Sequence, residues 1–282
     1  MEKITSVFYI FTAVLFLFFP KARGESATVA LLALKNVVLA TLFPMMVLTR
    51  AISGSALMDK LGNIIGKSRL WKRLSLSPAL IPVVLCGIIS GFPASARQIE
   101  RMVNEKTITP EEGEKALCLS SAPSPAFVIA VVGRTPLHGS LLFLFSLAIS
   151  YLVTCHKKSK ASPAPPCFSS VSLSSALTSS VTSAVAVGGS IVFFTLITSL
   201  FNFLPYPLPL IISALSELGS GAVTLLSHRI LLSFLTGWGG ISALCQIKSE
   251  APRVKTGLYV RVRLFSGTVL ALLEGLGFSH LF

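Results

Sequence analysis

Apolar residues in this chain come in long blocks that short charged segments separate. Residues 4–19, 27–48, 137–153, 181–204 and 264–282 are predominantly apolar along their whole length. A bilayer core of roughly 30 Å needs about 20 such residues in a helix, whereas a membrane β-barrel alternates apolar and polar positions. Because lipid offers no partner to backbone polar groups, the pattern predicts an all-α, multi-pass integral membrane protein.

Four further apolar segments are short or interrupted. Residues 78–96 and 208–226 are too short to cross twice and contain glycine near their middle, which predicts two re-entrant hairpins. Residues 116–133 and 230–247 are predicted to be broken helices. The four interruptions are Gly91-Phe92-Pro93, Ser120 to Pro125, Glu217 to Gly221, and Thr236 to Gly240.

The two halves of the chain present these features in the same order. After an N-terminal helix at 1–26, we expect a first repeat at 27–155, a Ser/Pro-rich cytoplasmic linker at 156–180 and a second repeat at 181–282. Each repeat contains a span, a hairpin, a broken helix and a further span. A cleaved signal peptide is the alternative for the N-terminal segment, but Pro20-Lys21-Ala22-Arg23 is unlike a small-residue cleavage site.

The distribution of basic residues predicts how the chain is oriented in the membrane. The chain has a formal net charge of +13, and its basic residues gather at 50–73, 156–160 and 248–263. Short basic loops lie in the cytoplasm, and placing all three there makes the repeats inverted, with a cytoplasmic N-terminus. The side on which residues 97–115 lie stays open, because their charges nearly balance. The basic residues form no stripe with interleaved aromatics, so a nucleic-acid partner is not expected.

The residues that could bind a solute or an ion lie at the four interruptions. Glu217 is a carboxylate within an apolar segment, a costly placement that favours a role in binding solute or ion; the alternative is a carboxylate satisfied by neighbouring backbone amides. Gly91, Pro93, Ser95, Pro123, Gly219, Gly239 and Gly240 shape the same four interruptions. Hydroxyls or an amide could come from Ser121, Ser124, Ser220, Ser242 and Gln246. Phe92 and Trp238 either stack on a ligand or simply pack.

No motif of a common enzyme class is present. The sequence contains no H-E-x-x-H, G-x-S-x-G or Walker element, and its five cysteines form no C-x-x-C pair. We therefore expect neither catalysis nor a cofactor or bound metal.

The interruptions also resemble a known family. Ser90-Gly91-Phe92-Pro93-Ala94-Ser95-Ala96, Ala122-Pro123-Ser124-Pro125-Ala126-Phe127, Glu217-Leu218-Gly219-Ser220-Gly221 and Gly237-Trp238-Gly239-Gly240-Ile241-Ser242 are similar, in this order, to motifs of the YlbJ-type sporulation membrane proteins. These belong to the nucleoside-recognition, or Gate, domain family. Ser95 and Pro123 stand where that family more often has glycine. The resemblance implies a fold related to concentrative nucleoside transporters, a bacterial cell membrane and a role in endospore formation.

The sequence thus predicts a protein of the lipid bilayer that binds and translocates a small polar, nucleoside-like solute. Phe92 and Gly219 should then lie close together near the membrane midplane. The alternative is a non-transporting receptor or assembly platform. Whether a coupling cation or a homo-oligomer is involved stays open.

Overall fold

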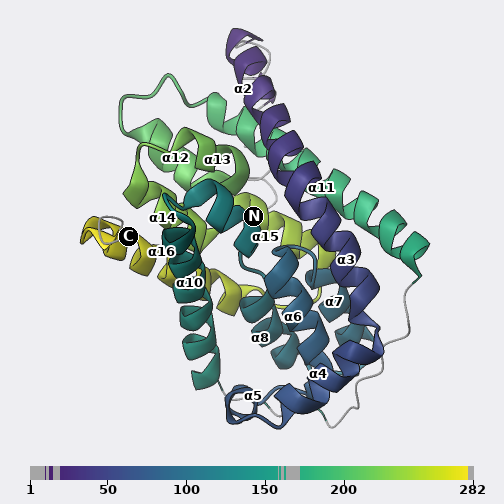
Figure 1. Ribbon diagram of the computed structural model, residues 1–282. Helices are drawn as coiled ribbons and strands as arrows, with labels where there is room; N and C mark the ends of the chain where they lie inside the picture. Colours follow the sequence, from purple (N-terminus) through teal and green to yellow (C-terminus); the bar gives the residue numbers. More distant parts are fainter. Residues whose placement is uncertain are drawn as a thin grey trace.

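The computed structural model describes residues 10, 13, 14, 20–157, 159, 162 and 172–278. Every regular element in these residues is a helix, as the apolar pattern predicts (Figure 1). Most of the predicted span at 4–19, and residues 279–282 of the predicted last span, lie outside the described residues.

The first half begins with three helical segments that follow one another without interruption: α2 (Pro20–Ala33), η1 (Leu34–Leu42) and α3 (Phe43–Ser53). Two short helices then form the base of the molecule in Figure 1: α4 (Ala56–Gly66) and α5 (Arg69–Leu74). The first hairpin comprises η2 (Pro78–Leu80), α6 (Ile81–Ser90) and α7 (Ala96–Asn104). The broken helix and the closing span are α8 (Pro110–Ser120), α9 (Pro125–Phe127), η3 (Val128–Val132) and α10 (Pro136–His156).

The second half of the chain begins with one long helix. This helix is α11 (Leu173–Ser199), which lies beside α2 and α3 (Figure 1). The second hairpin comprises α12 (Leu208–Ser216) and α13 (Leu218–Thr224), and the second broken helix comprises α14 (Arg229–Trp238) and α15 (Gly240–Glu250). The last helix is α16 (Gly257–Gly275), which begins before the predicted start at Leu264.

Five helices in the described part of the chain are long and apolar enough to cross a membrane. They are Gly24–Ser53, Pro110–Val132, Pro136–His156, Leu173–Ser199 and Arg229–Glu250. Large apolar side chains are exposed along these helices, among them Leu144 and Leu152 on α10, and Val185 and Phe193 on α11. A water-exposed belt of this kind would be unfavourable, so the chain is a membrane protein.

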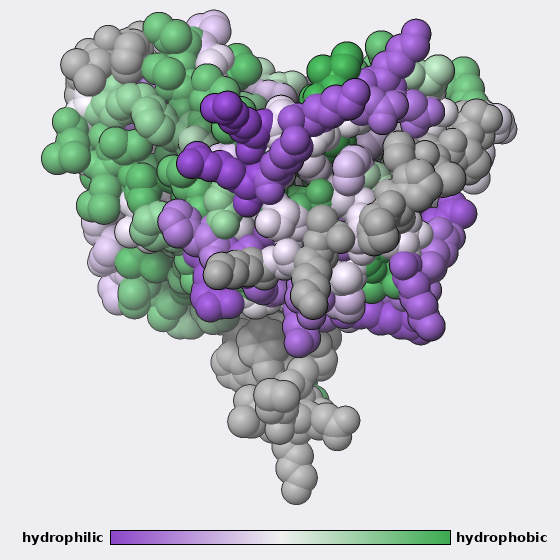
Figure 2. All heavy atoms as spheres, turned by 90° about the horizontal axis from the view of Figure 1, so that it is seen from below, coloured by the Kyte–Doolittle hydropathy of each residue, from purple (hydrophilic) through white to green (hydrophobic). Residues whose placement is uncertain are grey.

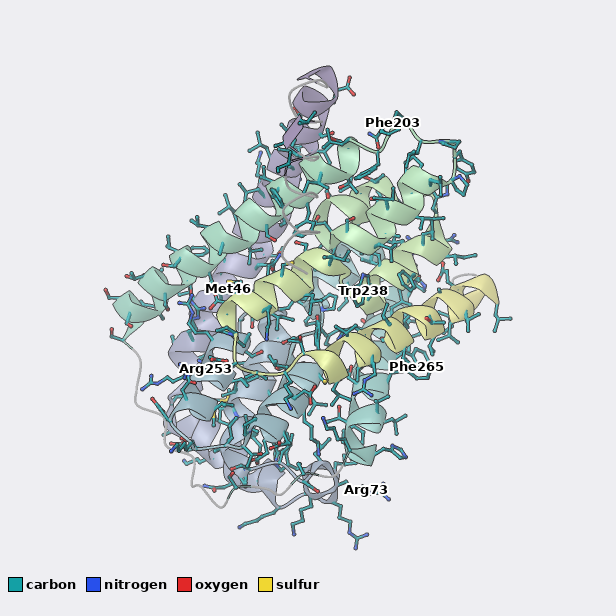
Figure 3. All side chains as sticks on the ribbon, turned by 180° about the vertical axis from the view of Figure 1, so that it is seen from behind. Met46, Arg73, Phe203, Trp238, Arg253 and Phe265 are labelled. Carbon is teal, nitrogen blue, oxygen red and sulfur yellow. The ribbon has the colours of Figure 1, made fainter. Side chains whose placement is uncertain are left out.

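The charged loops lie together at one end of the molecule. Seen from below Figure 1, hydrophilic side chains cover much of this face, with a hydrophobic region beside them (Figure 2). Arg73 extends from the lowest point of the molecule (Figure 3). The loops that carry the basic clusters lie at this end, because Lys157 and Leu258 N bond to Glu114, and Leu74, which directly follows the first cluster, accepts from Lys115 Nζ.

Buried acids in the first turns of α8 hold the loops together. Glu112 accepts hydrogen bonds from Ser77 N (2.7 Å) and from Ser162 Oγ (2.7 Å). Glu114 accepts from Lys157 Nζ (2.5 Å) and from Leu258 N (2.8 Å). Residues 97–115, whose side the sequence leaves open, therefore lie at the same end as the basic clusters.

The start of α8 follows its sequence signature. Thr109 Oγ1 accepts from Glu112 N (3.2 Å), and Glu112 Oε2 accepts from Thr109 N (2.9 Å). This reciprocal pair satisfies two backbone donors at the helix start, and Pro110 occupies the first turn, where it loses no bond.

Candidate functional site

The tip of the first hairpin rests on the first helix break. Gly91 ends α6 with φ 77°, a conformation that favours glycine. Phe92 N then donates to Ala122 O (3.1 Å). A Cβ at Gly91 would lie 2.8 Å from Ser124 N, so only glycine permits this approach. Ser95 Oγ and Ser120 Oγ, 2.7 Å apart, join the two segments a second time.

The first break exposes a new helix start. Ser121 follows the last residue of α8, and its hydroxyl is buried without a hydrogen-bond partner among the described residues. Ser124 caps the next turn by accepting from Phe127 N (3.3 Å). Pro123 and Ser124 both face the cavity described below.

The tip of the second hairpin is built around Glu217. Its backbone is extended (φ −150°, ψ 133°) between α12 and α13. Its carboxylate caps α13: Oε1 accepts from Gly219 N (2.7 Å), and Oε2 accepts from Ser220 N (2.6 Å) and Ser220 Oγ (2.8 Å). Neighbouring backbone N–H groups thus satisfy the Glu217 carboxylate, as the alternative interpretation expects. Glu217 also lines the cavity.

The second break supports that tip in turn. Gly239 and Gly240 have φ values of 87° and 88°, and a Cβ at Gly240 would lie 2.7 Å from Ser216 O. Trp238 Nε1 donates to Leu215 O (3.0 Å). The Trp238 side chain is buried between helices and does not line the cavity, so its contribution is packing and one hydrogen bond to α12.

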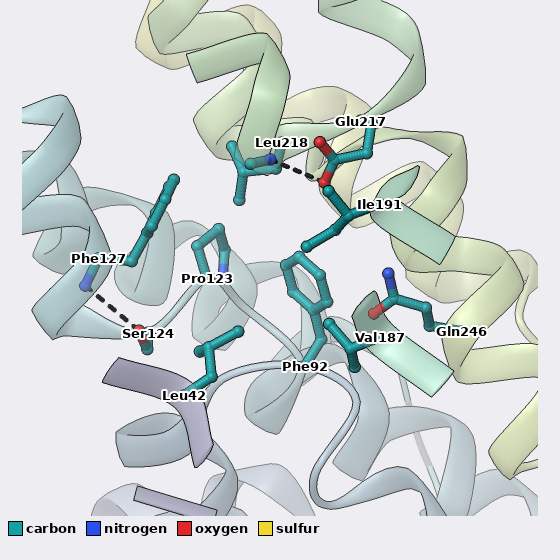
Figure 4. Close-up of a pocket in the computed structure, with 11 residues that line it drawn as sticks. Leu42, Phe92, Pro123, Ser124, Phe127, Val187, Ile191, Glu217, Leu218 and Gln246 are labelled. Atoms are coloured by element: carbon teal, nitrogen blue, oxygen red, sulfur yellow. Dashed lines mark hydrogen bonds between the residues drawn. The ribbon is translucent and has the colours of Figure 1, made fainter. Parts of the chain in front are cut away.

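Both hairpin tips and the first break line one central cavity, and the second break packs behind the tips (Figure 4). Its volume is about 30 Å³, close to the share of liquid volume that one water takes. The lining residues are Leu42, Phe92, Pro123, Ser124, Phe127, Val187, Ile191, Glu217, Leu218, Gly219 and Gln246. Phe92 and Gly219, from tips far apart in the sequence, are therefore close together, as the sequence predicts.

Gln246 contributes a third polar side chain to the cavity, in addition to those of Ser124 and Glu217. Its Nε2 donates to Ser242 Oγ (3.1 Å), and Ser242 Oγ lies 3.0 Å from Ser190 Oγ. Its Oε1 is buried and has no hydrogen-bond partner among the described residues. A buried acceptor without a donor costs about 1–3 kcal/mol, so this oxygen is suited to a ligand that donates or is positively charged.

No family model, curated protein or solved structure matches this chain. The assignment of a function therefore depends on the geometry of the site itself.

Of the remaining predicted residues, most lie one layer behind the cavity. Pro93 and Ser220 line two neighbouring cavities, and Gly239 lies behind the Phe92 ring, since a Cβ there would be 3.7 Å from Phe92 Cε1. The sequence reasoning missed five residues of the lining: Phe127 and Leu218, which lie beside interruptions, and Leu42, Val187 and Ile191, which belong to apolar spans. The spacing of Val187, Ile191 and Thr195 on one face of α11 is the only signal that could have found the two lining residues of that helix.

A second buried polar cluster also escaped the sequence analysis. Glu274, near the end of α16, lies 3.2 Å from His138 Nε2 and 3.5 Å from Arg229 Nε. Arg229 also donates to Val132 O (2.8 Å). The cluster joins α10, α14 and η3 to α16 away from the central cavity. No group of three metal-binding side chains occurs anywhere in the described residues.

Proposed function

We propose that this protein binds a small polar solute in the central cavity and translocates it across the membrane by alternating access. The observation that carries this proposal is that both hairpin tips and the first helix break line one small cavity, with the second break packed directly behind the tips. Broken helices at a midplane site are the usual construction of a secondary transporter, because their free backbone ends can bind ions and polar groups.

The arrangement of the hairpins supports inverted repeats. In Figure 1, α6 and α7 lie in the lower part of the molecule, at the charged end, and α12 and α13 lie in the upper part. The two tips therefore approach the cavity from opposite ends. With the charged end in the cytoplasm, the first hairpin enters from inside and the second from outside.

Size indicates that the cavity is closed in this conformation. Pockets that enclose a drug-sized ligand measure about 300–1,000 Å³, whereas the central cavity measures about 30 Å³. Entry of a nucleoside-sized solute requires the tips to separate, which is the motion that alternating access provides. The resemblance to the nucleoside-recognition family favours a nucleoside-like solute and a role in endospore formation.

The same closure also fits the second candidate, a non-transporting membrane receptor or assembly platform. Glu217 is fully hydrogen-bonded within its own hairpin, and a sealed, satisfied site is what such a platform would retain. The two candidates differ in whether solute crosses the bilayer.

Uptake by purified protein in liposomes, screened over nucleosides and related polar metabolites, tests the proposal. Gln246→Leu removes the unpartnered amide while keeping its volume, and should reduce uptake by tenfold or more. Gln98→Leu is the matched control, because Gln98 lies outside the central cavity, and should transport like the parent. Absence of uptake of every solute by correctly inserted parent protein would favour the platform.

A further inference from the structure

The central cavity has a larger neighbour on each side. One cavity, of about 260 Å³, is lined by α2, α11, α12 and α13 and includes Glu25, Thr195 and Ser220. The other, of about 220 Å³, is lined by α11, α15 and the first hairpin tip and includes Ser190, Gln246 and Glu250. We call them the outer and the inner vestibule, because the inner one lies toward the charged end.

All three cavities follow the same face of α11. Ala186, Val187 and Ser190 line the inner vestibule, Val187 and Ile191 the central cavity, and Thr195, Thr198 and Ser199 the outer vestibule. Positions 187, 191, 195 and 198 are three or four residues apart and therefore share one side of a helix. At 1.5 Å per residue, this face brings the three cavities into line over roughly 15–20 Å.

The walls between the cavities are thin and polar. Val187 and Gln246 line both the inner vestibule and the central cavity. On the other side, the hydroxyls of Thr195 and Ser220 are hydrogen-bonded (2.7 Å), and Ser220 Oγ donates to Glu217 Oε2 (2.8 Å). A chain of hydrogen bonds thus runs from the outer vestibule to the central cavity.

The charged residues that line these three cavities are acidic, whereas the protein as a whole is basic. The chain carries 24 Lys and Arg against 11 Asp and Glu. Nevertheless, each of the three cavities contains one carboxylate, from Glu25, Glu217 or Glu250, and no basic side chain of the described residues lines any of them. Aligned carboxylates in a low-dielectric channel concentrate cations and repel anions.

An independent observation points to the same ligand. Gln246 Oε1 is buried, lines the central cavity, and accepts no hydrogen bond from the described residues. Figure 4 shows the Gln246 amide beside Phe92 and Val187, with Ile191 between it and Glu217. An amide oxygen and a carboxylate are ligands that hard cations prefer, and a cavity of about 30 Å³ has room for one ion.

From these observations we infer that a small monovalent cation, either an alkali metal ion or an ammonium-type ion, moves along the α11 face through the three cavities. This inference rests on the proposed function, because both use the central cavity, and it adds the charge of the species that crosses. The Arg97–Glu250 ion pair (2.5 Å) holds the inner carboxylate in this closed conformation. The Arg97 side chain is 47% exposed and that of Glu250 is 8% exposed, so Arg97 can turn into solvent when a cation takes its place beside Glu250.

Flux into liposomes tests the inference. Labelled sodium, rubidium and methylammonium are supplied in turn, with labelled chloride as the anion control. We expect flux of at least one cation and none of chloride. Which of the three crosses then distinguishes an alkali metal ion from an ammonium-type ion.

A variant that reverses the charge of Glu25, in the outer vestibule, tests the inference further. Glu25 is exposed, so Glu25→Lys leaves packing intact and should reduce cation flux about tenfold at low ionic strength, with recovery at high salt. Glu105→Lys is the matched control, since Glu105 is exposed at the charged end, away from all three cavities. It should have no effect.

The outcomes separate this inference from the proposed function. Nucleoside uptake without any cation flux, and without sensitivity to Glu25→Lys, would keep the proposed function and overturn the cation route. Chloride flux, or faster flux in Glu25→Lys, would also overturn it. Absence of both solute uptake and cation flux would reject the two together.

Discussion

The carboxylate of Glu217 is not equivalent to an amide in this structure. Both of its oxygens accept from backbone N–H groups, Oε1 from Gly219 and Oε2 from Ser220. In Glu217→Gln, one oxygen becomes an NH₂ group that faces one of these donors. We therefore expect Gln, which matches the shape of Glu, to destabilise the hairpin.

The size of the effect follows from the bonds lost. A hydrogen bond to a charged group contributes about 1.5–3 kcal/mol, and a buried donor left without a partner costs about 1–3 kcal/mol. If the remaining amide oxygen of Gln accepts from Ser220, only Gly219 N loses its partner. Glu217→Gln should therefore lower the free energy of unfolding by about 2–5 kcal/mol. At roughly 2–4 °C per kcal/mol, the melting temperature in detergent should fall by about 5–15 °C.

Glu217→Asp separates stability from function. Aspartate is among the best N-cap residues, so it keeps both the charge and the cap, while its carboxylate is withdrawn from the cavity by one methylene group, worth about 0.8 kcal/mol of burial. We expect a melting temperature within a few degrees of the parent and a loss of about tenfold in uptake. A Gln variant as stable as the parent would refute the capping argument, and an Asp variant with full uptake would refute a role in the cavity.

Three further predictions address the fold and the topology. Gly240→Ala places a Cβ 2.7 Å from a backbone oxygen at positive φ and should cost about 2–4 kcal/mol; its control, Gly62→Ala, meets nothing within 4 Å and should not lower the melting temperature. Glu274→Gln breaks a buried ion cluster and should cost about 3–5 kcal/mol, measured as reduced abundance and thermal stability. Single cysteines at Ser68 and Ser159, in a chain without native cysteines, should react with an impermeant reagent only after cells are opened; labelling of intact cells would reverse the topology.

The sequence predicted the helical class and the four interruptions because both depend on local chemistry. Gly91, Pro123, Glu217 and Gly239 stop their helices whatever surrounds them, so each break could be placed before any tertiary contact was known. The same residues, or their neighbours, then formed the cavity. Phe92, at the first hairpin tip, and Gln246, in the helix that follows the second break, both line the cavity, and their role in binding stays a prediction.

The helix starts were less predictable because tertiary contacts decide them. α16 begins at Gly257, although Arg261 and Arg263 suggested a loop. The buried Arg263 guanidinium donates to Ser150 Oγ (2.9 Å) and Cys118 O (2.9 Å), which allows the helix to include it. These partners lie more than a hundred positions away in the chain, so no local pattern could reveal them.

α11 likewise begins within the segment predicted as a Ser/Pro-rich linker. Ser172 caps its first turn by accepting from Ser175 N (3.2 Å), and the hydroxyls of Thr178 and Thr182 bond to carbonyls one turn back (3.1 and 3.2 Å). Serine and threonine favour turns when their side chains compete with the backbone. Here the same side chains bond within the helix, so a polar composition did not mean a linker.

Each hairpin tip is held by the helix break of its own half. Phe92 N bonds to Ala122 O at the first tip, and Trp238 Nε1 bonds to Leu215 O beside the second. Across the cavity, by contrast, the first tip meets the second break through the Phe92 side chain at Gly239. Rotating that ring breaks no backbone hydrogen bond, whereas separating a tip from its own break would cost one or more. Within the site, each tip should therefore move together with its own break, whereas the Phe92 ring can turn away from Gly239.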